Sequence, residues 1–168
     1  GFSRRVAVKR LLARSERGLE LRTRFIDEAR IAATLDHPNI VKVFDFEELD
    51  GRHQLAMEFV DGASLEELRV RSLGGRFLSA RVVGFIVHEV ARALVHAHGR
   101  EVVHRDVSPC NVLVSKSGEV KLADFGLAKA AEKLWSTEPG AVSGKLNYLS
   151  PERKRGAEGA PTDDLWAL

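Results

Sequence analysis

The chain has almost no cysteine, no long apolar run and almost no net charge. Cys110 is its one cysteine, so an internal disulfide is impossible and we expect a reducing, cytoplasmic location for this segment. No apolar stretch approaches the roughly 20 residues of a membrane-spanning helix, and we expect no signal peptide and no membrane contact. The 26 Lys and Arg residues nearly cancel the 24 Asp and Glu residues, leaving +2. This balance argues against nucleic-acid binding through overall charge.

The sequence also lacks internal repeats and low-complexity tracts. Apolar residues make up 44% of its 168 residues, which is enough for one domain with a hydrophobic core. The chain begins at Gly1 rather than Met and stops at Leu168 inside an apolar stretch. Natural domains usually end in polar, exposed segments, so we expect that both ends of this domain are cut.

Hydrophobic periodicity predicts five strands and three helices. The predicted strands cover 5–10, 40–49, 54–60, 112–115 and 120–123. The predicted helices cover 18–35, 64–72 and 79–98, and we expect a loop over 128–145. Asp50-Gly51 between the second and third strands is a strong hairpin signal. Strands and helices are segregated along the chain, which indicates the α+β class.

Local signals mark where the predicted helices begin and end. The first helix must end before His37-Pro38, because the residue before a proline is pushed out of helical geometry. Ser64 is suited to be the N-cap of the second helix, and Gly99 is suited to cap the C-terminus of the third. Apolar residues occupy much of the circumference of this third helix, which predicts that it is buried in the core.

Four short motifs follow one another along the chain. They are Val6-Ala7-Val8-Lys9, His104-Arg105-Asp106-Val107-Ser108-Pro109-Cys110-Asn111, Asp124-Phe125-Gly126 and Ser150-Pro151-Glu152. Each motif alone is weak evidence, but four in this order and on these element types are strong. Together they resemble the signature set of the eukaryotic-type (Hanks-type) serine/threonine protein kinases. The Val-Ser-Pro wording at 107–109 is more typical of bacterial members than of animal ones.

The resemblance implies a role for each polar residue of these motifs. Phosphoryl transfer needs positioning and charge neutralisation more than covalent help from the protein. Asp106 would be the catalytic base, and Asn111 and Asp124 would hold Mg²⁺ through hard oxygen ligands. Lys9 would contact the α- and β-phosphates of ATP. Such a lysine needs an anchor, for which Glu28 on the first helix stands at the matching spacing.

The resemblance also implies a two-lobed fold with a nucleotide between the lobes. We expect a partial N-lobe over 1–60, without its glycine-rich loop, and a partial C-lobe over 61–168. In the segment that links the lobes, Met57 would line the back of the adenine pocket. The backbones of Glu58 and Val60 would hydrogen-bond the adenine edge.

The C-terminal residues resemble the start of the large central helix of the C-lobe. Asp164, in Asp164-Leu165-Trp166, would brace the catalytic loop from this helix. The chain stops three residues into this helix, so we expect a domain truncated at both ends. The apolar surface left exposed would make the piece poorly stable alone.

Ser108 is the main departure from the family, which usually has a lysine there that binds the γ-phosphate. The absence of this lysine favours an alternative, a pseudokinase that serves as a nucleotide-binding scaffold. Lys145 stands where the family usually has a threonine close to the catalytic Asp. One hypothesis is that Lys145 reaches back toward Asp106 and the γ-phosphate and is itself catalytic. The alternative is an exposed loop lysine.

Protein hydroxyl groups are the substrates that the resemblance implies. Pro109 is retained and the Ala-Arg pattern of tyrosine-specific relatives is lacking, which favours Ser and Thr. A small-molecule kinase of related fold is disfavoured by the Ser150-Pro151-Glu152 segment. Arg105 is placed to pair with a phosphorylated residue of the loop between Asp124 and Glu152. The candidates for self-phosphorylation are Ser136, Thr137 and Ser143, with Thr137 slightly favoured because it lies mid-loop.

Overall fold

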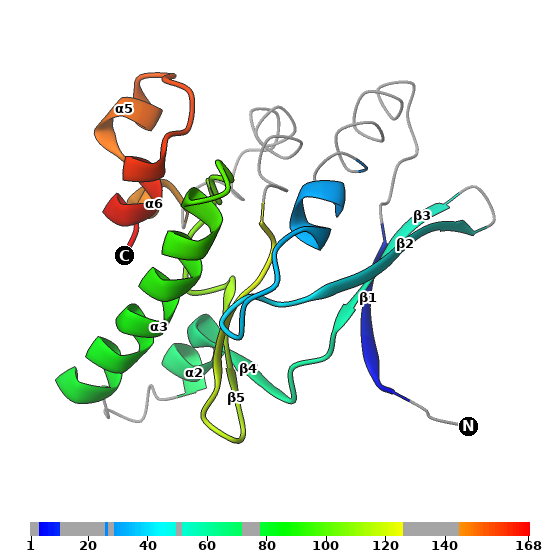
Figure 1. Cartoon of the computed structure of the whole chain (residues 1–168). Coiled ribbons are helices and arrows are strands. Elements are labelled where there is room, and N and C mark those ends of the chain that lie inside the picture. The colour runs from blue at the N-terminus through cyan, green and yellow to red at the C-terminus, as the bar shows by residue number, and fades with distance from the viewer. Residues whose placement is uncertain (1–3, 11–25, 27–28, 50–51, 72–77, 126–144) are drawn as a thin grey trace.

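The computed structural model describes residues 4–10, 26, 29–49, 52–71, 78–125 and 145–168. They form two small sheets and several helices, which confirms the predicted α+β class (Figure 1). The strands are β1 (Val6–Arg10), β2 (Val43–Leu49), β3 (Arg52–Glu58), β4 (Gly62–Ser64), β5 (Val112–Ser115) and β6 (Val120–Leu122). The helices are α2 (Leu65–Arg71), α3 (Ala80–His98), α5 (Pro151–Lys154), α6 (Pro161–Trp166) and the 3-10 helix η1 (Lys145–Tyr148); residues 26 and 29–33 are also helical.

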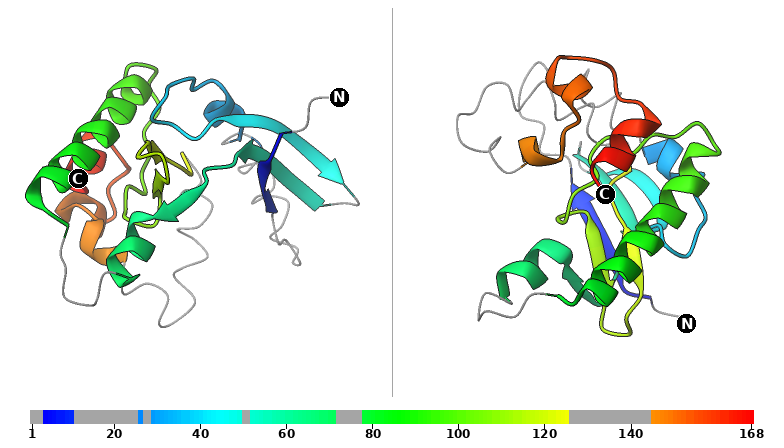
Figure 2. Two further views of the ribbon diagram at one scale, coloured as in Figure 1. Left: turned by 90° about the horizontal axis from the view of Figure 1, so that it is seen from below. Right: turned by 90° about the vertical axis from the view of Figure 1, so that its left-hand side faces the viewer.

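The first sheet has the antiparallel order β1-β3-β2. Leu49 faces Arg52 across the ladder, so β2 and β3 form the hairpin that was predicted, although Asp50 and Gly51 lie outside the described residues. Lys9 faces Leu55 on the central strand. Two further views place this sheet at one end of the molecule and α3 with α6 at the other (Figure 2).

The second sheet has the antiparallel order β4-β5-β6. Gly118 turns between β5 and β6 with a φ of 87°, in the region that favours glycine. β4 was not predicted, because three residues are too few to show a strand pattern. Ser64 at its end also caps α2: its Oγ accepts from Glu67 N at 3.1 Å, and the carboxylate of Glu67 accepts from Ser64 N at 2.9 Å. This reciprocal capping box confirms the expected N-cap.

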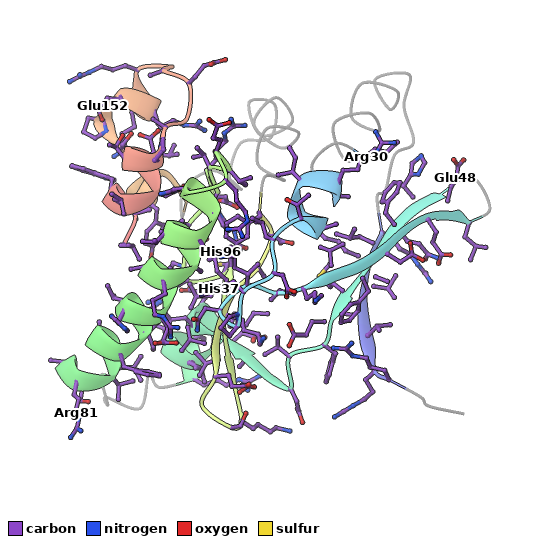
Figure 3. All side chains as sticks on the ribbon, in the orientation of Figure 1. Arg30, His37, Glu48, Arg81, His96 and Glu152 are labelled. Atoms are coloured by element: carbon purple, nitrogen blue, oxygen red, sulfur yellow. The ribbon has the colours of Figure 1, made fainter. Side chains whose placement is uncertain are left out.

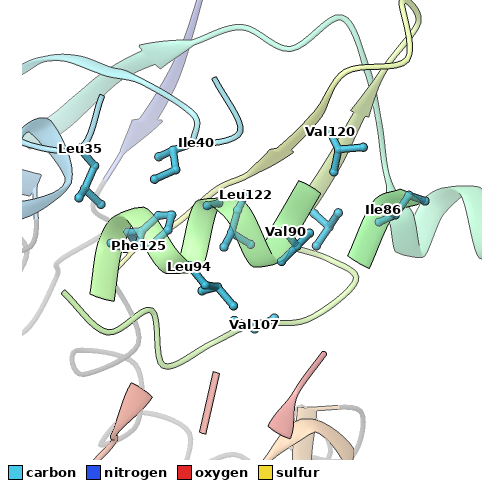
Figure 4. Packing of buried hydrophobic residues seen from close by; sticks show 12 residues of the cluster. Leu35, Ile40, Ile86, Val90, Leu94, Val107, Val120, Leu122 and Phe125 are labelled. Atoms are coloured by element: carbon cyan, nitrogen blue, oxygen red, sulfur yellow. The ribbon is translucent and has the colours of Figure 1, made fainter. Parts of the chain in front are cut away.

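The core lies between α3, β6 and the segments that flank them (Figure 4). Leu94 of α3 and Leu122 of β6 are wholly buried, and Phe125 packs beside them. The chain after the first helix joins this core through an isolated parallel bridge between Ile40 and Leu122, in which Val41 N donates to Leu122 O at 2.9 Å. This bridge fixes the turn after the first helix to the edge of the second sheet, and the two sheets remain separate.

The turn that follows the first helix is fixed to α3. The rings of His37 and His96 lie against each other with centroids 4.9 Å apart (Figure 3). Asn39 Nδ2 donates to Glu89 Oε2 at 2.7 Å and to Val120 O at 2.9 Å. Burial lowers the pKa of His37, with a smaller contribution from His96, which favours the neutral form of the His37 ring.

Helix α3 begins where the sequence indicated, with Ser79 Oγ accepting from Val82 N at 3.4 Å. The prediction that this helix is buried in the core holds for one face only. One face, which includes Val90, is buried, whereas Phe85 is 51% exposed and Val95 is 73% exposed. The reason is that, within the described ranges, α3 packs mainly against β6 and α6. No helix among the described residues is long and apolar enough to cross a bilayer.

Candidate active site

A buried carboxylate organises the loop after α3. Asp164 of α6 is 1% exposed, and its Oδ2 accepts from His104 N and from His98 Nε2, both at 2.8 Å. Its Oδ1 accepts from Arg105 N at 2.7 Å. A buried charge is costly unless it is hydrogen-bonded, and three donors satisfy this one. The expectation that Asp164 braces the 104–106 loop is confirmed, and the brace holds Arg105 at a φ of 69°.

His104 connects this loop to the end of β6. Its Nδ1 accepts from Asp106 N at 3.2 Å, so its proton is on Nε2, which donates to Ala123 O at 2.9 Å. The ring lies edge-on to Phe125, with centroids 4.6 Å apart. Complete burial lowers the pKa of His104 against the opposing pull of nearby carboxylates, which keeps the ring neutral. Both ring nitrogens of His104 are thus engaged by backbone groups, which supports a structural role for this residue.

Asp106 and Asn111 are held together by one side-chain amide. Asn111 Nδ2 donates to Asp106 O at 2.7 Å and to Asp106 Oδ2 at 3.0 Å. The backbone carbonyl of Asn111 accepts from Ala123 N at 2.9 Å, which brings the loop over residues 104–111 beside Asp124. Because the amide nitrogen is engaged, the amide oxygen of Asn111 is the atom suited to face a cation.

Lys9 reaches this group of residues from the first sheet. Its Nζ lies 2.8 Å from Asp124 Oδ1, with side chains 39% and 30% exposed. Asp124 has a φ of 64°, which turns it out of the direction of β6. Sequence reasoning missed this ion pair, because it assigned Lys9 to Glu28. Glu28 lies outside the described residues.

Met57 lines a small apolar pocket next to Asp124. The other lining residues include Ala29, Leu55 and Phe125, and the cavity of about 20 Å³ has room for about one water molecule. Met57 therefore shares this pocket with Ala29 of the first helix and with Asp124. Its predicted contact with adenine stays a prediction.

Ser108 is buried within the loop over residues 104–111, at 4% exposure, and its Oγ has no hydrogen-bond partner in the described part of the chain. Its backbone carbonyl accepts from Asn111 N at 2.9 Å. The backbone of Lys145 begins η1, so the loop predicted over 128–145 is wrong at its last residue. The loop candidates Ser136, Thr137 and Ser143 lie outside the described residues, as do Gly126 and the side chain of Lys145.

A divalent cation would find few protein ligands here. Across the described ranges, no three His, Cys, Asp or Glu side chains come together to hold a metal. Asn111 and Asp124 offer one neutral and one charged oxygen ligand, which fits a hard ion that takes its remaining ligands from phosphate and water.

These contacts place Lys9, Asp106, Asn111 and Asp124 in one site between the two sheets. The sequence model of the protein kinase domain matches residues 2–168. The chain belongs to the protein kinase family. Its resemblance to that family, predicted from four motifs, is confirmed over nearly the whole chain.

Bacterial kinases are among its relatives. It is 37% identical to the serine/threonine-protein kinase PrkC of Bacillus subtilis, over 99% of this chain and 25% of the relative. It is 41% identical to PknJ of Mycobacterium tuberculosis, another serine/threonine-protein kinase, over 96% of this chain and 28% of the relative. It is also 37% identical to the tyrosine-protein kinase MasK of Myxococcus xanthus, over 100% of this chain and 27% of the relative. The chain thus spans about a quarter of these relatives.

The kinase fold is confirmed by solved structures. The PknI kinase domain of Mycobacterium tuberculosis matches with a TM-score of 0.72 at 34% identity. The match covers 96% of this chain and 59% of that one. A double mutant of the same domain matches with a TM-score of 0.74 over 99% of this chain.

Proposed function

We propose that this chain carries the catalytic centre of a protein kinase that transfers the γ-phosphoryl group of ATP to Ser or Thr hydroxyls of proteins. The observation that supports this most is the convergence of Lys9, Asp106, Asn111 and Asp124 from both sheets. Asp106 acts as the base that accepts the proton of the substrate hydroxyl. Asn111 fixes the Asp106 carboxylate in place, which is the positioning that phosphoryl transfer needs.

ATP and Mg²⁺ are the ligands of this site in the proposal. Asn111 and Asp124 hold the ion through oxygen atoms, and Lys9 contacts the α- and β-phosphates, with Glu28 as its anchor. The ion neutralises the charge that develops on the phosphates. Lys9 and Asp124 form an ion pair at 2.8 Å, and each would take a partner of opposite charge when the nucleotide and its ion are bound.

The adenine base lies between the lobes in this proposal, with residues 1–60 in the N-lobe and 61–168 in the C-lobe. Met57 forms the back wall of its pocket, and the backbones of Glu58 and Val60 bind its edge. Two features support this placement. Met57 lies close to Asp124, and no other described residue hydrogen-bonds the backbone of Val60.

Phosphoamino-acid analysis tests the function and its hydroxyl specificity. The full-length protein is incubated with Mg²⁺ and γ-labelled ATP, and the labelled residues of the protein and of a generic substrate are identified. Label on Ser and Thr is expected. Label on Tyr alone would contradict the proposed specificity, and a tyrosine-protein kinase among the relatives makes that arm necessary.

A pseudokinase is the second candidate, because Ser108 replaces the usual catalytic-loop lysine. It would bind Mg-ATP, seen as a rise in the melting temperature, without transferring label. We propose instead that Lys145 supplies the missing cation toward Asp106 and the γ-phosphate. Turnover should then fall in Lys145→Ala and recover in the double exchange Ser108→Lys/Lys145→Thr. Unchanged turnover in Lys145→Ala would remove this role.

Self-phosphorylation of the loop before Ser150-Pro151-Glu152 is proposed as the regulatory step. A phosphate on Ser136, Thr137 or Ser143 would pair with Arg105 and order the loop. The buried Nε of Arg105 has no hydrogen-bond partner in the described part of the chain, which supports this. We propose a cytoplasmic location for the segment. Mass spectrometry of active protein that finds none of the three phosphorylated would contradict the regulatory step.

A further inference from the structure

A nearly buried lysine lies behind the segment that links the two sheets. Lys121 of β6 has a side chain that is 11% exposed, and its ammonium lies 2.9 Å and 3.1 Å from the two carboxylate oxygens of Glu58. The same ammonium donates to Pro38 O at 2.9 Å. Lys121 thus joins the second sheet to the end of β3 and to the turn after the first helix.

Glu58 also makes two hydrogen bonds to the backbone of Lys42. Glu58 N donates to Lys42 O at 2.8 Å, and Glu58 Oε2 accepts from Lys42 N at 3.3 Å. Both the backbone and the carboxylate of Glu58 are therefore fixed. Glu58 is the last residue of β3 that is paired in the first sheet before the chain crosses to the second sheet.

In the linker that follows, residues 59–60, the guanidinium of Arg5 lies over the Phe59 ring, 4.8 Å from its centroid. Within the described part of the chain, Phe59 and Val60 make no backbone hydrogen bond. An open cavity of about 310 Å³ borders the linker on the side where Lys121 lies, so side-chain packing does not fix it there. Unpaired backbone groups in such a segment are available to a ligand, and their direction depends on the anchored residue before them.

We propose that Lys121 is a positioning residue for adenine recognition. The ammonium of Lys121 bridges the carboxylate of Glu58 and the carbonyl of Pro38. This bridge fixes the peptide planes that present the carbonyl of Glu58 and the N–H of Val60 to the base. This role rests on the proposed ATP site. Lys121 lies outside the kinase motifs and would set the affinity of that site for ATP. Lys121 acts through Glu58 and touches no reacting atom.

The test compares variants of the full-length protein by steady-state kinetics and by calorimetric binding of ADP. Lys121→Met and Glu58→Gln should each raise the KM for ATP and the Kd for ADP about tenfold, the equivalent of one well-aligned hydrogen bond, with kcat within about twofold. The double variant should be no weaker than either single variant, because one contact is lost in all three. Lys121→Arg, which keeps the charge and the donors, should stay within about threefold of wild type.

Lys116→Met is the matched control. Lys116 borders the same cavity and pairs with Asp61 at 2.9 Å, but their side chains are 77% and 49% exposed, so solvent screens this pair. Its nucleotide affinity should equal that of wild type. Equal losses in Lys116→Met and Lys121→Met would show a general charge effect and overturn the proposal.

The KM and kcat split separates positioning from a structural role. If losses in Lys121→Met followed the folded fraction in thermal melts, with the Kd for ADP unchanged, the inference would be wrong. Should Lys121→Met not fold, Glu58→Gln decides, since an unchanged Kd for ADP there has the same meaning. If wild type itself neither bound ADP nor transferred phosphate, the proposed function would fail first, and the positioning role with it.

Discussion

At the scale of single residues, one carboxylate shapes the loop over residues 104–111. Asp164 accepts three hydrogen bonds and is almost fully buried. Two of the donors are consecutive backbone N–H groups, at His104 and at Arg105, whose φ is positive. The geometry of Asp106 therefore depends on a residue about 60 positions away in the sequence.

Replacing this carboxylate should cost stability. In Asp164→Asn an NH₂ group replaces one carboxylate oxygen, so a neighbouring N–H donor loses its acceptor. We expect a loss of about 2–4 kcal/mol in the free energy of unfolding. Chemical denaturation of the full-length protein measures the change. Asp36→Asn, at an exposed carboxylate paired with Lys42, should change it by less than about 1 kcal/mol. Similar values for the two variants would contradict the role given to Asp164.

At the scale of elements, the join between the linker and the second sheet depends on a close backbone approach. Gly62 begins β4, and a Cβ added there would lie 2.0 Å from Val114 O and 2.7 Å from Ser115 Cα on β5. Both neighbours are backbone atoms, so neither can move without breaking the ladder.

Gly62→Ala should therefore destabilise the domain by about 1–3 kcal/mol, as overpacking does elsewhere. Thermal unfolding of the full-length protein with and without Mg-ATP measures this change. Gly84→Ala is the matched control, since a Cβ added there meets nothing within 4 Å, and it should be neutral or slightly stabilising on a helix. A Gly62→Ala melting temperature equal to that of wild type would contradict the close approach.

The elements also show what the sequence could and could not predict. The hairpin, the cap at Ser64 and the paired strands around Gly118 follow from local pattern, and all are present. β4 was missed because three residues have no periodicity. The exposed face of α3 was missed because periodicity reports which residues are apolar, not what packs against them.

In the candidate site, the sequence predicted which residues take part better than it predicted which residues they contact. Lys9, Asp106, Asn111 and Asp124 could be named from motifs, but the Lys9–Asp124 contact depends on how the two sheets are placed. Lys121 could not be found at all from pattern, because a lysine between two valine or leucine positions of a strand normally indicates a solvated face. Its pairing with Glu58 is a tertiary contact across 63 positions.

At the scale of the whole molecule, the half-buried His37 and the buried His104 link stability to pH. The pKa values of His37 and His104 are lowered from the ordinary 6.5, in both cases mainly by burial. The unfolded chain takes up protons on these rings below pH 6.5, while the folded chain resists them. The contribution of these two rings to the free energy of unfolding should therefore be complete above pH 6.5 and should decline as the pH falls below it.

Denaturation of the full-length protein between pH 8 and pH 5 checks this decline. The groups that act on His37 are His96, Arg92 and Arg100, which lower its pKa, and Glu89, which raises it. In His37→Asn one of the two rings is removed, so the decline should be shallower than in wild type. An identical decline in the variant, or none in wild type, would contradict this account.

The central claim is that both sheets together form one phosphoryl-transfer site with Asp106 as its base. The most direct test is single-turnover transfer from γ-labelled ATP by wild-type and Asp106→Asn full-length protein, with Mg-ATP affinity measured in parallel. Loss of a positioned base should reduce the transfer rate by about 10²–10⁴-fold, while the affinity for Mg-ATP stays close to that of wild type. Transfer by Asp106→Asn at the wild-type rate would contradict the claim.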